Sequence, residues 1–123
     1  MSGEAWVTSV TIDCADPVRL ARFWADLLGL EVRPRESRYV ALTRPATGTP
    51  ELVFQPVPEE KAGKVRLHLD IGVHDLDAAR RRAVELGASP AGDLDDPGDD
   101  SLVVLRDPEG NEFCLIRRAA GEL

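Results

Sequence analysis

The chain has 123 residues and a formal charge of −7, with 43% hydrophobic and 30% charged residues. This length suits one domain, and the apolar share is that of a globular protein, which excludes a disordered chain. The sequence has no run of about 18 apolar residues, so we expect no transmembrane helix. Such an acidic chain also lacks the basic face on which nucleic-acid and anionic-membrane binding depend.

The two cysteines, Cys14 and Cys114, lie too far apart in the sequence to form a Cys-x-x-Cys metal motif. The N-terminal residues do not have the basic start and apolar stretch of a secretion signal. We therefore expect a cytoplasmic protein with reduced thiols.

The first half of the chain predicts a strand followed by a helix. Residues 6–15 alternate between apolar and polar side chains, which is typical of a strand. Asp16 is a suitable helix N-cap, and Pro17 suits the first helical position, where a missing N–H costs nothing. One apolar stripe follows at helical spacing and stops at Gly29, which predicts that the helix ends there.

Two further strands are predicted in this half, at about 38–43 and 51–57, with a Pro- and Gly-rich turn between them. Phe23 and Trp24 belong to the apolar stripe of the helix, so we expect both in the core.

The second half repeats this order about 59 residues later. Residues 65–74 alternate and predict a strand, and Asp75 caps a second helix that ends at Gly87. Strands are predicted at about 101–106 and 112–117. The repetition indicates a duplicated unit, too long in period and too few in copies for a solenoid.

Polar residues gather on one face of the strand at 65–74. Arg66, His68 and Asp70 share this face, while the apolar residues between them point the other way. His68 is a candidate ligand contact or general base, and Asp70 could orient it. The alternative is a polar ladder of three paired side chains with a structural role only.

Several short motifs, taken in order, resemble a known superfamily. They are Asp13-Cys14-Ala15-Asp16-Pro17, Phe23-Trp24, Leu28-Gly29, Arg66-Leu67-His68-Leu69-Asp70 and Asp107-Pro108-Glu109-Gly110-Asn111-Glu112-Phe113-Cys114. The sequence resembles the vicinal oxygen chelate superfamily, which includes glyoxalase I, bleomycin-resistance proteins and extradiol dioxygenases, and it is most similar to the small glyoxalase-like domains. The resemblance covers about residues 5–118.

This resemblance implies an α+β fold in a single domain over residues 1–123. Two paired βαβββ modules, at about 5–58 and 64–118, would form a cup-shaped mixed sheet with the helices outside. It also implies a homodimer that takes its ligand inside the cup.

In the metal-using members, four cup-facing positions supply His, Gln or Glu. The resemblance implies Ser9 and His68 on the first strands, Cys114 on the last strand of the second module, and Gln55 as its counterpart. Ser9 and Cys114 do not match the imidazole and oxygen ligands of such sites, so we expect no catalytic metal. If a divalent metal does bind, we expect His68, Gln55 and Glu112 to hold it.

Two residues of the last predicted strand remain open to two interpretations. Cys114 is either a nucleophile or a small residue that fills the space of a lost carboxylate. Glu112 either brings a carboxylate to the cup or is a solvent-exposed strand end. Cys14, just before the helix cap, is interpreted as structural.

The leading hypothesis is a glyoxalase-like protein that binds a small organic molecule in the cup without a catalytic metal. The expected ligand-binding residues are His68, Asp70, Arg66, Gln55, Ser9 and Cys114, with Trp6, Tyr39 and Phe54 as candidates for an apolar wall. One alternative is a metal-dependent or His-based lyase, isomerase or dioxygenase, and another is an inert interaction module. Whether the chain is an enzyme therefore stays open, because function depends on the site and not on the fold.

Overall fold

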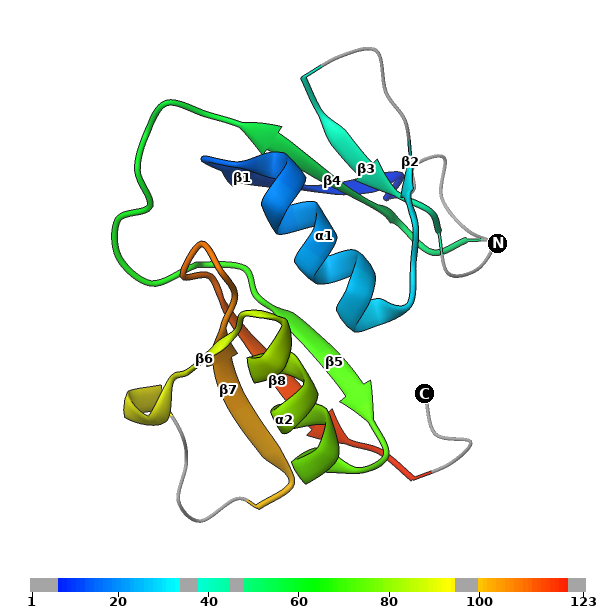
Figure 1. Cartoon of the computed structure of the whole chain (residues 1–123), viewed down its shortest axis with the longest axis vertical. Coiled ribbons are helices and arrows are strands. Elements are labelled where there is room, and N and C mark those ends of the chain that lie inside the picture. The colour runs from blue at the N-terminus through cyan, green and yellow to red at the C-terminus, as the bar shows by residue number, and fades with distance from the viewer. Residues whose placement is uncertain (1–6, 34–37, 45–47, 95–99, 120–123) are drawn as a thin grey trace. The chain divides into compact units, whose positions relative to one another are not determined.

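The computed structural model describes residues 7–33, 38–44, 48–94 and 100–119 (Figure 1). The chain divides into two compact units, Met1–Glu60 and Lys61–Leu123, each with its own sheet and helix. The order of one strand, one helix and three strands that the resemblance implies is confirmed in both units, so the fold is α+β with two βαβββ modules. Within the described ranges, no helix is long and apolar enough to cross a membrane.

The first unit contains a four-stranded sheet in the order β1-β4-β3-β2. Its elements are β1 (Ser9–Cys14), α1 (Pro17–Leu28), β2 (Val32–Arg33), β3 (Val40–Leu42) and β4 (Glu51–Pro56). β1 runs parallel to β4, whereas β4 with β3 and β3 with β2 are antiparallel. α1 packs on one face of this sheet, against β3 and β4 (Figure 1).

The boundaries of α1 are the predicted ones. The Asp16 carboxylate accepts a hydrogen bond from the Arg19 amide at 3.2 Å, which satisfies a backbone donor at the helix start. Gly29 ends the helix with a φ of 70°, a left-handed conformation that is strained for residues with a Cβ. The predicted core residues Phe23 and Trp24 are buried and contact each other edge to face, with ring centroids 5.3 Å apart.

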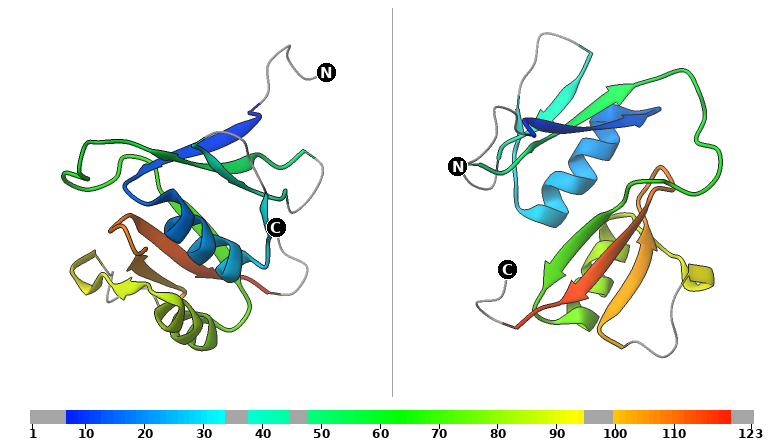
Figure 2. Two further views of the ribbon diagram at one scale, coloured as in Figure 1. Left: turned by 45° about the horizontal axis from the view of Figure 1, so that its top comes forward. Right: turned by 180° about the vertical axis from the view of Figure 1, so that it is seen from behind.

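The second unit contains a four-stranded sheet in the order β5-β8-β7-β6. Its elements are β5 (Leu69–Val73), α2 (Leu76–Leu86), β6 (Ser89–Pro90), the 3-10 helix η1 (Gly92–Leu94), β7 (Leu102–Arg106) and β8 (Glu112–Arg117). β8 lies between β5, to which it is parallel, and β7, to which it is antiparallel (Figure 2). α2 packs against β7 and β8 and covers one face of the sheet.

The start of β5 differs from the sequence prediction. The alternating pattern predicts a strand from residue 65, but β5 begins at Leu69, and Leu67 is 70% exposed instead of facing the core. The amide of Val65, which a strand would bond to its neighbour, instead donates to the side chain of Glu112. The segment before β5 is therefore held by a side chain and not by the sheet.

Candidate functional site

The two faces of the second sheet differ in chemistry. On β8, Cys114 lies opposite Asp70 of β5 on one side and opposite Val104 of β7 on the other. Residues directly opposite one another in a sheet point to the same face, so these three side chains share one face. The alternate residues of the strands, Phe113 and Leu115 among them, are buried on the face that α2 covers. The face away from α2 is thus the one that can meet a ligand, and we call it the open face.

His68, Asp70 and Cys114 form a cluster on the open face. Nε2 of His68 lies 3.2 Å from Oδ1 of Asp70, and a ligand atom from each of the three side chains lies within 4.8 Å of the others. The side chains of His68 and Asp70 are 45% and 54% exposed, and Cys114 is half-buried. The cluster therefore brings an imidazole, a carboxylate and a thiol together where solvent reaches them.

A pocket of about 140 Å³ lies beside this cluster. Its lining residues are Lys64, His68, Val104, Glu112, Phe113 and Cys114. Polar groups from the segment before β5 and from β8 meet the apolar side chain of Val104 in it, a combination that is usual in small-molecule pockets. A space of this size takes a molecule about as large as benzene.

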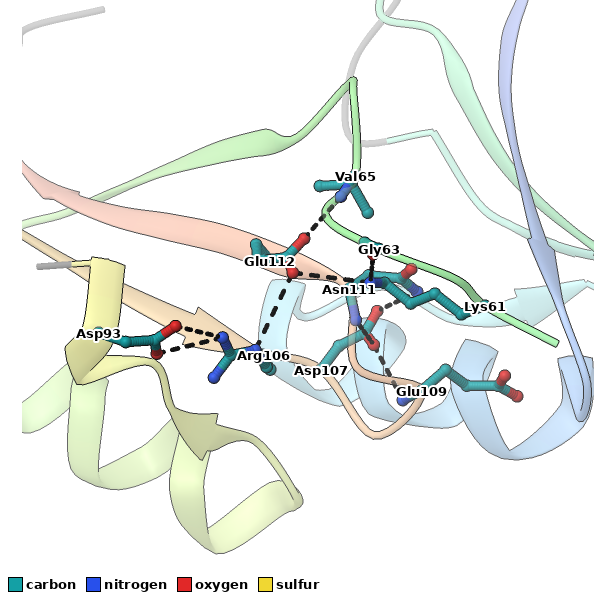
Figure 3. A network of polar contacts seen from close by, with 9 residues as sticks. All are labelled: Lys61, Gly63, Val65, Asp93, Arg106, Asp107, Glu109, Asn111 and Glu112. Atoms are coloured by element: carbon teal, nitrogen blue, oxygen red, sulfur yellow. Dashed lines mark hydrogen bonds and ion pairs between the residues drawn. The ribbon is translucent and has the colours of Figure 1, made fainter.

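Glu112 is buried at the start of β8, with only 7% of its surface exposed. Its Oε2 accepts a hydrogen bond from the Val65 amide at 2.9 Å, and its Oε1 lies 3.6 Å from Nζ of Lys61 (Figure 3). Burial raises the pKa of this carboxyl. The hydrogen bonds from the Val65 amide and its own backbone amide, together with the ammonium groups of Lys61 and Lys64, lower the pKa by more than burial raises it. The net effect is a pKa of Glu112 below its usual value, so the group is ionised at neutral pH.

The side chain of Arg106 lies between two carboxylates. Its Nε is 3.9 Å from Oε1 of Glu112, and its Nη2 donates to both oxygens of Asp93 at 3.0 and 3.1 Å (Figure 3). The hydrogen bond from Arg106 lowers the pKa of the Asp93 carboxyl. The guanidinium thus connects β7 to η1 on one side and to β8 on the other.

The turn between β7 and β8 is built around the buried carboxylate of Asp107. Its Oδ1 accepts from the amides of Glu109 and Asn111 at 2.9 and 3.0 Å, and its Oδ2 accepts from Nδ2 of Asn111 at 3.1 Å (Figure 3). An aspartate that bonds the backbone two residues ahead is a common way to form a tight turn. This turn fixes where β8 begins and hence where Glu112 and Cys114 lie.

Among the other expected site residues, Arg66 is exposed in the segment before β5, while Ser9 and Gln55 lie in the first unit, on β1 and β4. Of the six expected ligand-binding residues, the cluster therefore contains His68, Asp70 and Cys114. Glu112 is buried and ion-paired, so the interpretation of it as a solvent-exposed strand end is wrong.

The expectation that Gln55 is the counterpart of Cys114 in the first module is wrong by two residues. Thr11 and Asp70 occupy equivalent positions, each five residues before its helix-capping aspartate. Asp70 lies opposite Cys114, but Thr11 lies opposite Val53, so Val53 is the counterpart of Cys114. The second module has two more residues between Asp70 and Cys114 than the first has between Thr11 and Val53, and this difference shifts the counterpart by two positions.

The aromatic wall expected from the sequence is also revised. Phe54 is fully buried and lies opposite Ile12 and Val40 on the core side of its sheet, so it cannot meet a ligand. Tyr39 is exposed, and Trp6 lies outside the described residues.

Sequence reasoning missed Lys64 and Val104 as pocket residues. Val104 is identified only by its register opposite Cys114, which hydrophobic patterning does not specify. Lys64 lies just before the strand predicted at 65–74, and nothing in its neighbouring sequence indicates that it lines a pocket.

A second, larger depression of about 520 Å³ lies at the start of α2. Its polar groups already serve the fold: the Asp75 carboxylate caps α2 by accepting from the Ala78 amide at 3.1 Å. Nδ1 of His74 lies 2.8 Å from the carbonyl oxygen of Arg118. We therefore regard the smaller pocket beside Cys114 as the candidate site.

At the positions where the resemblance implies metal ligands, the second unit carries His68 and Cys114, which have suitable ligand atoms, and the first unit carries Ser9 and Val53, which do not. The first unit therefore does not supply the imidazole and oxygen ligands that the resemblance implies for a catalytic metal. Within the described residues, His68 and Cys114 together with Asp70 form one group close enough to hold an ion. Its nitrogen, oxygen and sulfur atoms suit zinc better than metals that prefer oxygen ligands.

Comparison with known proteins agrees with this architecture. A family model described as a glyoxalase-like domain matches residues 9–116. No curated protein matches the chain.

Solved structures with the same fold include a glyoxalase/bleomycin resistance protein/dioxygenase family enzyme from Burkholderia phytofirmans PsJN. It has a TM-score of 0.75 and 21% identity, over 92% of this chain and 98% of that chain. The fosfomycin resistance protein FosX from Mesorhizobium loti has a TM-score of 0.70 and 16% identity, over 97% of this chain and 96% of that chain. TnmS3, an antibiotic-binding protein from Streptomyces sp. CB03234, has a TM-score of 0.66 and 21% identity, over 97% and 100%. At these identities the likeness is one of fold.

Proposed function

The chain belongs to the glyoxalase-like family of the vicinal oxygen chelate superfamily, and from this we propose that it binds a small organic molecule on the open face of its second sheet. The observation that carries the proposal is the 140 Å³ pocket whose wall includes both His68 and Cys114. Pockets for drug-sized ligands measure roughly 300–1,000 Å³, so this pocket suits a smaller molecule or one end of a larger one.

Each part of the pocket has a role in binding. His68 offers a hydrogen-bonding imidazole that Asp70 orients through its Nε2–H, and Lys64 offers a positive charge. Val104 offers apolar contact, because its side chain shares the open face with Cys114. The ligand that suits this wall is compact and largely apolar, with one polar or anionic group.

Two of the structural neighbours support this proposal by what their names describe, one as a fosfomycin resistance protein and the other as an antibiotic-binding protein. Binding without chemistry suits a chain whose residues do not fit the catalytic metal of the superfamily. We therefore propose sequestration of a small molecule without a resident metal.

Isothermal titration calorimetry on tag-free, chelator-treated protein tests the proposal, with fosfomycin and a library of small carbonyl and carboxylate fragments as probes. We expect at least one probe to bind, and His68→Ala to weaken its binding by about tenfold or more, the effect of losing one good hydrogen bond. His74→Ala is the matched control, because His74 lies outside this pocket. The proposal is wrong if no probe binds or if both variants weaken binding alike.

A second candidate function is supported by the close approach of His68, Asp70 and Cys114. A metal held by these residues, or His68 acting alone as an acid or base, would support a lyase, isomerase or dioxygenase. This candidate predicts stoichiometric metal or turnover where simple binding predicts neither. We further propose a homodimer, as the family resemblance implies, which light scattering coupled to size-exclusion chromatography tests.

A further inference from the structure

The cluster on the open face has the components of an activated thiol. Cys114 supplies the sulfur and His68 a base, and Asp70 lies 3.2 Å from Nε2 of that base. When Nε2–H is donated to Asp70, the lone pair of Nδ1 remains to accept a proton. A nucleophile, a base and a group that orients the base are the arrangement on which covalent catalysis by cysteine depends.

The thiol and the base lie in the wall of the same pocket, so a ligand in the pocket meets both. One ring nitrogen of His68 lies within 4.8 Å of Sγ of Cys114, a limit longer than a hydrogen bond, but nucleophile–base distances are commonly loose before a ligand binds. Lys64 lines the pocket as well and brings a positive charge to it.

We propose that Cys114 captures small α,β-unsaturated carbonyl compounds by conjugate addition, an inference that rests on the proposed binding function and names its ligand class. A sulfur nucleophile prefers soft, polarisable carbon, and Lys64 can stabilise a carbonyl oxygen that gains negative charge. Val104 provides an apolar contact for the carbon skeleton.

The step balances without a co-reactant. The sulfur–carbon bond forms at the β-carbon while the carbon–carbon π bond breaks, and the electrons move to the carbonyl oxygen as an enolate. The thiol proton passes to His68 and then to the α-carbon, which regenerates the carbonyl group. The adduct therefore has the summed mass of protein and acceptor, with no leaving group, oxidant or reductant.

The chain offers its own controls. Cys14, the other thiol, is 3% exposed, and its Sγ lies 3.6 Å from the carbonyl oxygen of Gln55. His74, the other histidine, lines the other depression. Cys14 controls for general thiol reactivity, and His74 controls for the loss of an imidazole.

The test uses 2-cyclohexen-1-one, a probe about the size of the pocket, with chelator-treated protein and intact-mass and peptide mass spectrometry. We expect one adduct, on Cys114 and not on Cys14, formed at least about tenfold faster than on N-acetylcysteine, since general-base assistance is typically worth more than that. The rate should saturate with probe concentration. It should fall about tenfold or more in His68→Gln, but not in His74→Gln, and Cys114→Ser should give no adduct.

Reaction no faster than that of N-acetylcysteine, a rate that does not saturate, or no effect of His68→Gln in a variant with wild-type circular dichroism would overturn the proposal. Cyclohexanone lacks the alkene, so it can bind in the pocket but cannot be captured, and it therefore tests the proposed binding function separately from the capture reaction. If cyclohexanone binds to Cys114→Ser in calorimetry but the enone gives no adduct with the wild type, capture is wrong and binding stands. If cyclohexanone does not bind and no adduct forms, the pocket itself is not the site.

Discussion

The side chain of Glu112 accepts a hydrogen bond from the backbone amide of Val65 at 2.9 Å, across 47 positions of sequence. This bond ties the start of β8 to the segment that precedes β5, and these two parts of the chain supply the pocket residues Cys114, Lys64 and His68. A single buried carboxylate therefore connects two walls of the candidate site.

Replacement of this carboxylate tests its contribution. Glu112→Gln keeps an oxygen for the Val65 amide but loses the charge that faces Lys61 and Arg106. We expect the free energy of unfolding at pH 7 to fall by about 1–2 kcal/mol, measured by urea denaturation.

The loss of stability in Glu112→Gln should depend on pH. Because the pKa of Glu112 is lowered in the folded protein, the unfolded chain binds a proton first as the pH falls. The contribution of Glu112 is thus complete above the ordinary glutamate pKa of about 4.3 and is lost as the pH falls below it. The difference between wild type and Glu112→Gln should shrink in that range. Glu85→Gln, at an exposed position on α2, controls for the loss of one negative charge, and an equal loss in both variants would contradict the account.

Removal of the Asp107 side chain should disrupt the turn before β8. Asp107→Ala leaves the amides of Glu109 and Asn111 without their acceptor, and we expect unfolding to become easier by about 2–3 kcal/mol. Glu109→Ala retains its backbone amide and should change the free energy of unfolding by less than about 0.5 kcal/mol. Equal midpoints for the two variants in urea denaturation would show that the carboxylate does not hold the turn.

Two exposed glycines should respond differently to alanine. Gly29 ends α1 with a φ of 70°, so Gly29→Ala should cost about 1 kcal/mol through backbone strain alone. A Cβ at Gly72, in β5, would lie at an ordinary 3.5 Å from Cγ of Arg118. Gly72→Ala should therefore be neutral or stabilise the protein by up to about 1 kcal/mol. Thermal denaturation measures both, and the reverse order would refute the assignment of strain.

Metal analysis distinguishes simple binding from metal-dependent catalysis. Protein purified without chelator or a metal-binding tag should contain well under one equivalent of nickel, zinc, iron or manganese by mass spectrometry. His68→Ala and His74→Ala should give the same low content. Stoichiometric metal that disappears only in His68→Ala would favour a metal-dependent enzyme instead.

The helices and most strands follow from local signals. Asp16 and Pro17 begin α1 and Gly29 ends it, because caps depend on neighbours within a few residues. β8 and β4 also have nearly their predicted bounds. The two-residue strands β2 and β6 are too short for alternation to reveal.

What the sequence missed depends on contacts between distant residues. The strand predicted from residue 65 does not form there, because the Val65 amide donates to Glu112 instead of to a neighbouring strand. The counterpart of Cys114 is Val53, because the second module has two more residues between the equivalent positions. The common face of His68 and Asp70 was predictable from their spacing. Their closeness to Cys114 required the register of β5 and β8, which the family resemblance suggested and periodicity does not define.

The location of the bound molecule is the most direct test of the account. Isotope-labelled protein is titrated with cyclohexanone, and the backbone amide signals are followed by nuclear magnetic resonance. We predict that the largest shift changes cluster at Lys64, His68, Val104 and Cys114, and that they disappear in His68→Ala but not in His74→Ala. Changes centred on the depression around Asp75 and Asp77, or the absence of any change, would contradict the proposal that this pocket is the binding site.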